Sequence, residues 1–298
     1  MQSGLATMPA EELSAGKVRR RTPWSEGVRR LRKQKAAVIG GALVLLFILT
    51  GLFAPLLAPH DPIEQNLANT LQPPSAEHWF GTDDSGRDMF SRILYGARIS
   101  MTIGIFSVLG SLVVGTLLGL IAGFYGKWID TLISRIFDVM LAFPGILLAI
   151  AIVAILGPGL FNALLAIAIV NVPMYGRLVR AKVLGIKQEE YIMAARAQGM
   201  SQVRILFRHG LPNSWTPLIV QGTLGVASAI LEAAALGFLG LGAQPPEAEW
   251  GKMLADSRDY ITTAPWVVMI PGFAIMASVI GFNLFGDGLR DALDPKAQ

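Results

Sequence analysis

The sequence contains no cysteine and only three histidines among its 298 residues. Without cysteine the chain forms no disulfide bond, binds no metal through thiolates and has no thiol nucleophile. The histidines, His60, His78 and His209, are far apart in the sequence, which argues against a metal centre built from several imidazoles. We therefore predict no catalytic residue, no metal ligand and no cofactor-binding residue in this chain.

Charged residues are scarce as well. They make up 15% of the chain, against about 25% in ordinary soluble domains. Hydrophobic residues make up 53%, and the mean hydropathy is +0.52. The net charge of +4 does not indicate a nucleic-acid partner, because the basic residues lie between apolar runs. This composition excludes a lone soluble globule and favours a membrane protein.

Four stretches contain no charged residue at all, and a fifth contains only Glu232. The four cover residues 36–59, 99–126, 139–176 and 260–286, and the fifth covers 211–246. A helix crosses the hydrocarbon core of a bilayer with about 20 residues. The 139–176 stretch is long enough for two crossings and is interrupted by Gly157-Pro158-Gly159. The pattern predicts an all-α membrane protein with six transmembrane helices.

Lysine and arginine are distributed unevenly between the segments that join these spans. If the N-terminus is cytoplasmic, the inner segments hold 20 of them and the outer segments hold 5. Because basic residues retain loops in the cytoplasm during insertion, both termini are predicted to be cytoplasmic. The predicted organisation is a basic N-terminal segment (1–35), a first transmembrane helix (36–59), an outer loop (60–98), a transmembrane core (99–286) with an inner loop (182–214), and a cytoplasmic tail (287–298).

Two interpretations fit the basic N-terminal segment. Trp24, Val28 and Leu31 fall on one helical face among basic residues, which suits a helix lying on membrane lipid. The alternative is a solvated positive segment that only sets the topology.

The spans contain two features of note. Gly115, Gly119 and Gly123 recur at four-residue spacing and predict a surface for close helix packing. Glu232 is the only ionisable residue deep in a span, and Asn171 and Asn283 are polar residues in neighbouring spans. Glu232 either faces a wet translocation path or is a protonated carboxyl that is hydrogen-bonded to one of these asparagines.

The inner loop, residues 182–214, reads as two short helices. The first has acids in its opening turn and ends at Gly199, and Pro212 is predicted to end the second. Ala194 and Ala195, flanked by Tyr191 and Arg196, suggest a small-residue surface suited to a groove of a cytoplasmic partner. The alternative is an amphipathic helix pair resting on lipid.

This loop resembles the EAA loop of bacterial ABC importer permeases. The family pattern is Glu-Ala-Ala, three residues, Gly, nine residues, Ile, any residue, Leu-Pro. Met193 stands at the position of the family's glutamate, and His209 stands at the position of the isoleucine. The salt link that this glutamate would form is therefore not assumed for this chain. Glu190 is the nearby acid in the sequence. The resemblance implies a coupling helix that contacts an ATPase subunit through Glu190, Tyr191, Ala194, Ala195, Arg196, Gly199, Leu211 and Pro212.

The outer loop carries a second resemblance. The stretch from His78 to Ser100, which begins His-Trp-Phe-Gly-Thr-Asp-Asp-Ser-Gly-Arg-Asp, is similar to dipeptide, oligopeptide and nickel importer permeases. Its spacing of acids does not fit a calcium-binding EF-hand. We instead expect a loop that is ordered by paired charges and that caps the pore or meets a binding protein. The residues concerned are Asp83, Asp84, Arg87, Asp88 and Arg92.

Further matching stretches, including Glu249-Trp250-Gly251, extend the resemblance over residues 24 to 296. The chain is most similar to the second permease subunit of dipeptide importers. The alternatives are an oligopeptide, glutathione or nickel-chelate importer of the same group, or an ATP-independent secondary transporter of another class.

The resemblance implies a type I ABC importer transmembrane fold in the bacterial inner membrane. It implies a heterodimer with a homologous permease, two ATPase subunits that bind ATP and Mg, and a periplasmic or lipid-anchored substrate-binding protein. The chain itself has no Gly-x-x-x-x-Gly-Lys-Ser/Thr loop, so it is not expected to hydrolyse ATP.

Overall fold

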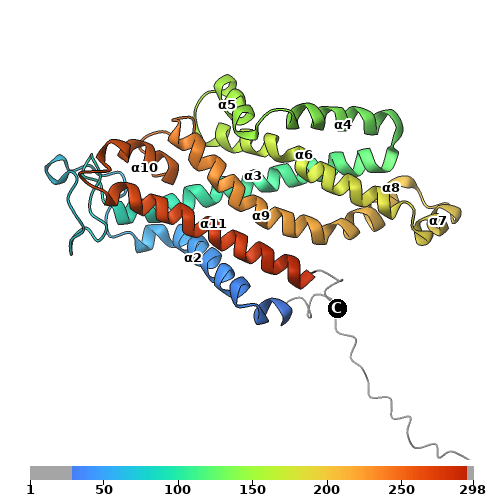
Figure 1. Ribbon diagram of the computed structural model, residues 1–298, viewed down its shortest axis with the longest axis horizontal. Coiled ribbons are helices and arrows are strands. Elements are labelled where there is room, and N and C mark those ends of the chain that lie inside the picture. Colours follow the sequence, from blue (N-terminus) through green and yellow to red (C-terminus); the bar gives the residue numbers. More distant parts are fainter. Residues whose placement is uncertain (1–28, 294–298) are drawn as a thin grey trace, which may run out of the picture.

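The computed structural model describes residues 29–293, which form a long bundle of helices (Figure 1). Within this range β-structure is limited to one isolated bridge between Thr82 and Asp88. The elements in order are α2 (Lys35–Leu57), η1 (Leu67–Asn69), α3 (Met89–Tyr125), α4 (Lys127–Leu141), α5 (Gly145–Leu156), α6 (Leu160–Ile186), α7 (Glu190–Ala197), α8 (Gln202–Ile205), η2 (Leu206–Gly210), α9 (Leu211–Phe238), α10 (Trp250–Ser257), η3 (Arg258–Tyr260) and α11 (Trp266–Leu293).

Five segments are long and apolar enough to cross a membrane: α2, α3, α6, α11, and α9 together with the turns that precede it. The pair α4 and α5, bent by 94°, gives a sixth crossing if it is counted as one span. The predicted all-α membrane fold is confirmed. The third predicted span is not one straight helix, because the chain bends between α4 and α5 at Pro144. Proline has no backbone N–H to donate, and it restricts the conformation of the residue before it.

The helix α4 carries charges along one face and is held to α6 by ion pairs. Arg180 of α6 pairs with Asp130, and Arg177 pairs with Asp138. These two acids therefore lie on the side of α4 that meets α6, while Trp128 and other large apolar side chains of α4 are exposed.

The glycine repeat of α3 packs against α6, as predicted. A Cβ atom added to Gly115 would lie 2.6 Å from the carbonyl oxygen of Val172, and one added to Gly123 would lie 2.9 Å from the Cβ atom of Val183. The backbones of α3 and α6 are so close at these positions that only glycine fits there.

The first long helix, α2, lies on the periphery of the bundle beside α11 and α3 (Figure 1). A Cβ atom added to Gly40 would lie 2.5 Å from the backbone nitrogen of Phe285. On the opposite face Leu52 is 66% exposed and Leu56 is 81% exposed. This apolar face suits contact with lipid or with another membrane subunit.

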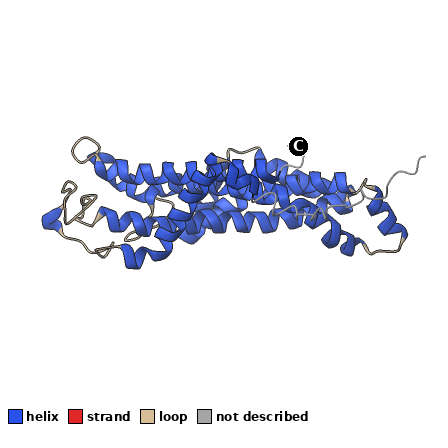
Figure 2. Cartoon of the chain, turned by 90° about the horizontal axis from the view of Figure 1, so that it is seen from below, coloured by secondary structure: helices blue, strands red, loops and turns tan. Residues whose placement is uncertain are grey.

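Most of the loops lie at the two ends of the bundle (Figure 2). The segment between α2 and α3 lies with α10 at one end, and α7 and α8 lie at the other (Figure 1). The core helices are longer than the predicted spans, since α3 begins at Met89 and α11 continues to Leu293. Residues 29–33 are helical, but Trp24 and Val28 of the candidate interfacial helix lie outside the described residues.

Candidate functional site

The first helix of the inner loop forms where the sequence predicts it. It follows Glu189, whose backbone is extended, and it has Glu190 in its first turn, where a negative charge suits the helix dipole. It ends at Ala197, and Gly199, two residues further on, has φ +77 and donates its N–H to the carbonyl of Arg196 at 2.9 Å. A left-handed residue of this kind ends a helix and is favourable for glycine.

The prediction that Pro212 ends the second helix is wrong. The helical path runs from α8 through η2, a π-helical turn, into α9 without a break. Leu211 donates its N–H to the carbonyl of Leu206 across this wide turn. Pro212 then lies at the second residue of α9, directly after the π-helical turn, and does not interrupt the helical path. Leu211 is half-buried and Pro212 is exposed.

The two faces of α7 differ sharply in exposure. Ile192 and Ala195 are buried against the bundle, with Ala195 only 7% exposed, whereas Ala194 is exposed. The predicted small-residue surface is therefore wrong for Ala195, because adjacent helical residues point about 100° apart and only one of the two alanines faces outward. The outward face consists of Glu190, Tyr191, Met193, Ala194, Arg196 and Ala197.

The inner loop is fastened to the ends of the long helices. The ammonium group of Lys187 donates to the carbonyl of Phe124 at 2.8 Å, and the guanidinium of Arg196 lies 5.9 Å from the Phe124 ring. The rings of Tyr191 and His209 are 5.7 Å apart. Burial, together with the nearby charge of Arg196, lowers the pKa of Lys187. These contacts join α7 and the end of α6 to the end of α3.

No ion pair of Glu190 is found within residues 29–293. The side chain is exposed and free to meet a partner. Gly199 is exposed too, with no atom within 4 Å of the position that a Cβ would take.

Glu232 is joined to one of its two candidate neighbours. The side-chain amide of Asn171 donates to Oε2 of Glu232 at 2.9 Å and to the carbonyl of Ile167 at 3.0 Å. This bond links α6 to α9, and both residues are partly buried. Asn283 lies exposed on α11 and makes no hydrogen bond to Glu232. The structure therefore brings together Glu232 and Asn171 but not Asn283.

The charges of the outer loop pair as expected. Asp83 is buried; its Oδ2 accepts from Nε of Arg87 at 2.6 Å, and its Oδ1 accepts from the backbone N–H of Arg87 at 2.9 Å. Arg92 is also buried, with Nε 3.4 Å from Oδ2 of Asp83, and it donates to the carbonyl of Pro62 at 2.9 Å. Asp84 is exposed, and its Oδ1 lies 3.6 Å from Nη2 of Arg87, which is a longer ion pair than that of Asp83.

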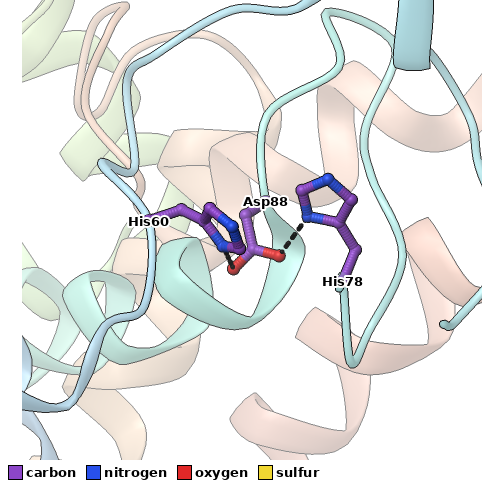
Figure 3. Close-up of side chains that lie close together, drawn as sticks. All are labelled: His60, His78 and Asp88. Atoms are coloured by element: carbon purple, nitrogen blue, oxygen red, sulfur yellow. Dashed lines mark hydrogen bonds and ion pairs between the residues drawn. The ribbon is translucent and has the colours of Figure 1, made fainter. Parts of the chain in front are cut away.

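Asp88 begins α3 and meets two histidines. Its Oδ2 accepts from the backbone N–H of Ser91 at 2.8 Å, which caps the helix, and its Oδ1 lies 2.9 Å from Nδ1 of His78. His60 lies on the other side of the same carboxylate (Figure 3). Our sequence interpretation missed this cluster. His78 stands in the same motif as Asp88, but nothing local predicts that His60 joins them.

Glu249 is a second residue whose structural role the sequence pattern did not reveal. Its carboxylate caps α10 by accepting from the N–H groups of Gly251 at 2.9 Å and Lys252 at 2.8 Å. Its Oε2 would lie 2.1 Å from a Cβ atom on Gly237 of α9. Burial raises the pKa of Glu249, while the two backbone N–H groups oppose the shift. Trp250, fully buried beside it, donates to the carbonyl of Ile93 at 3.2 Å and ties α10 to α3.

Two family models match the sequence. Residues 115–298 match the model described as binding-protein-dependent transport system inner membrane component. Residues 22–74 match the model of the N-terminal transmembrane domain of oligopeptide transport permease C.

The chain is similar to permeases of known importers over nearly its whole length. It is 66% identical to a dipeptide transport system permease protein of Alkalihalophilus pseudofirmus, over 92% of this chain and 90% of that protein. It is 52% identical to a di/tripeptide transport system permease protein of Pseudomonas aeruginosa, over 92% and 93%. It is 50% identical to a glutathione transport system permease protein of Pectobacterium atrosepticum, over 93% and 92%.

Among solved structures the fold is similar to an inward-facing methionine ABC transporter, MetNI. The TM-score is 0.56 at 20% sequence identity, over 69% of this chain and 98% of that one. At this identity the likeness concerns the fold alone, and it agrees with the predicted type I importer architecture.

Proposed function

The chain belongs to the family of binding-protein-dependent transport system inner membrane components, and on this premise we propose that it forms half of the translocation pore of a dipeptide importer. It is a multi-pass inner-membrane permease and not an enzyme, since ATP hydrolysis in such importers belongs to separate subunits. The observation that carries the proposal is the outward face of α7, at the end of the bundle remote from the outer loop.

Short peptides are the proposed substrates. The relatives described above are named for dipeptides, di/tripeptides and glutathione, all of which are small peptides. The highest identity among these three supports a dipeptide as the cargo.

The outward face of α7 is proposed to insert into a cleft of an ATPase subunit, which binds ATP and Mg. Tyr191 is 44% exposed and Met193 is 53% exposed, so the face offers apolar area to a partner beside the small Ala194. The contacts of Lys187 and Arg196 with Phe124 join this face to α3. Movement of the ATPase subunits would thereby reach the spans that line the pore.

The other proposed partners contact different parts of the bundle. A homologous permease completes the pore, because a single chain of this family supplies half of it. Two ATPase subunits bind at the α7 end. A periplasmic or lipid-anchored binding protein docks at the outer loop, which the buried Asp83, Arg87 and Arg92 hold in one shape. The Glu232 and Asn171 pair is proposed to lie beside the translocation path.

The experiment is reconstitution of the importer in liposomes with both permeases, the ATPase subunits and the binding protein. Ala194→Trp should overfill the ATPase cleft; overpacking typically costs about 1–3 kcal/mol, so ATPase association should weaken about 5- to 150-fold. Dipeptide uptake should fall in parallel. Ala76→Trp, in the exposed outer loop, is the matched control and should leave ATPase association unchanged. Normal association and normal uptake in Ala194→Trp would refute the proposed coupling face.

A further inference from the structure

Two histidines and an aspartate meet in the outer loop, at the end of the bundle opposite to the outward face of α7. Nδ1 of His78 lies 2.9 Å from Oδ1 of Asp88, and Nδ1 of His60 lies 3.8 Å from Oδ2 of the same residue. One ligand atom from each of the three residues lies within 4.8 Å of the others. In Figure 3 the two imidazole rings flank the carboxylate, and each turns its Nδ1 atom toward it.

The backbone holds each of these side chains in place. Asp88 is fixed as the cap of α3 by its bond to Ser91. His60 donates its own backbone N–H to the Ser91 hydroxyl at 3.2 Å, and His78 donates its backbone N–H to the Ser75 hydroxyl at 3.0 Å. The three ligands come from three separate segments and are preorganised by bonds that a bound ion would leave intact.

One atom of the cluster is unsatisfied. Nδ1 of His60 is shielded from solvent, yet it has no hydrogen-bond partner. Its 3.8 Å distance from Asp88 is too long for a hydrogen bond. A buried polar atom without a partner is unfavourable, and a metal ion between the rings and the carboxylate would satisfy it.

The distances suit a small divalent ion. Zinc binds imidazole nitrogen and carboxylate oxygen at about 2.0–2.2 Å, so two ligands of a tetrahedral site lie about 3.3 Å apart. The observed separations of 2.9 and 3.8 Å lie on either side of that value. The two distances end on different oxygens of Asp88, and the ligand atoms of the cluster lie up to 4.8 Å apart. Side-chain movements of about 1 Å would bring both nitrogens and one carboxylate oxygen to the spacing of a zinc site.

The surroundings favour a cation as well. The cluster borders a cavity of about 120 Å³ that is also lined by the acids Asp61, Glu64 and Glu77. Their negative charge raises the local concentration of cations. The cavity also leaves room for a water molecule at the fourth coordination position.

We propose that His60, His78 and Asp88 form a divalent transition-metal site, with zinc as the metal that fits best. Both imidazoles bind through Nδ1 in the neutral form and Asp88 binds as the carboxylate. The ion ties the segment after α2 and the loop around His78 to the first turn of α3. The site therefore stabilises the outer loop, and it concerns a different part of the chain from the proposed coupling face.

The test is direct zinc binding to the full-length chain, purified in detergent with a tag that contains no histidine. The chain has no cysteine, so its three histidines are the strong zinc ligands available. After equilibration with Zn²⁺ alone and gel filtration, elemental mass spectrometry should find one zinc ion per chain. The affinity should fall at least about tenfold in His60→Gln and in His78→Gln. His209→Ala, which changes the histidine at the opposite end, is the matched control and should bind like the parent.

A second measurement guards against loss of fold in the variants. Zn²⁺ should raise the melting temperature of the parent and of His209→Ala, and a chelator should reverse the rise. The rise should be absent in His60→Gln and His78→Gln. Absence of zinc from the parent at micromolar free Zn²⁺, or equal binding and equal thermal shifts in the two variants, would overturn the site. Neither measurement depends on transport, so this outcome is separate from that of the proposed function.

Discussion

Gly119 of α3 and Gly176 of α6 meet backbone to backbone, since a Cβ atom added to Gly119 would lie 2.3 Å from the carbonyl oxygen of Gly176. A Cβ atom on Gly176 would in turn lie 2.4 Å from the ring of Phe137 in α4. Three helices therefore converge at a point where there is no room for a single methyl group.

This contact predicts that Gly119→Ala destabilises the bundle. The added methyl group must push apart two backbones, and overpacking of this kind costs about 1–3 kcal/mol. Gly110→Ala is the control on the same helix, because its Cβ would make an ordinary contact of 3.4 Å with Ala168. Thermal unfolding in detergent, followed by tryptophan fluorescence, should show a lower melting temperature for Gly119→Ala only. Equal melting temperatures would contradict the close approach.

The second prediction concerns the neighbouring acids of the outer loop. Asp83→Ala should remove the buried counter-charge of Arg87 and Arg92, leaving Arg87 with only the exposed Asp84 at 3.6 Å. Breaking a buried ion pair in this way costs about 3–5 kcal/mol. Asp84→Ala should cost less than about 1 kcal/mol, because Asp84 is exposed. Thermal unfolding and protease resistance of the outer loop compare the two. A loss of stability that was equal in both variants would show that Asp83 does not organise the loop.

These two examples indicate what the sequence could predict. The glycine repeat was predictable because helical periodicity alone places its members on one face. The pairing of Asp83 with Arg87 was predictable because the partners are four residues apart. Both features depend on local spacing, which the sequence displays directly.

Features that depend on tertiary packing were not predictable. Ala194 and Ala195 are chemically identical, so nothing in the sequence says which of them faces the bundle. The effect of Pro212 depended on a π-helical turn that the residue pattern does not reveal. His60 and His78 meet only because the chain after α2 folds back onto the first turn of α3.

The third prediction concerns Glu232 in the interior of α9. Glu232→Gln should reduce dipeptide uptake only modestly, because an amide oxygen still accepts the bond from Asn171. Glu232→Lys should abolish uptake, because it places a positive charge in a span beside a donor. Uptake is measured in liposomes at matched amounts of assembled importer. Normal uptake by the lysine variant would show that the site is wet and has no part in transport.

The fourth prediction is the orientation of the chain in the membrane. Because the native chain has no cysteine, single cysteines report their side of the membrane without background. Ala76→Cys, in the outer loop, should react with a membrane-impermeant maleimide in intact cells. Ala197→Cys, at the end of α7, should react only after the membrane is opened. Both alanines are exposed in the chain expressed without its ATPase subunits, so each thiol is then accessible to reagent on its own side. The reverse pattern of labelling would invert the proposed topology.

The last prediction separates the two faces of α7. Ala195 is buried against the bundle, so Ala195→Trp should displace α7 from its seat even when no partner is present. Overpacking of about 1–3 kcal/mol would raise the population in which the loop is open about 5- to 150-fold. The isolated chain should then be cut faster by trypsin at Arg196 and Arg204. Ala194→Trp should leave the rate of cleavage unchanged, because the new ring points away from the bundle. Equal cleavage rates for the two variants would mean that α7 does not rest on the bundle through Ala195, and the described division into an inner and an outward face would then be wrong.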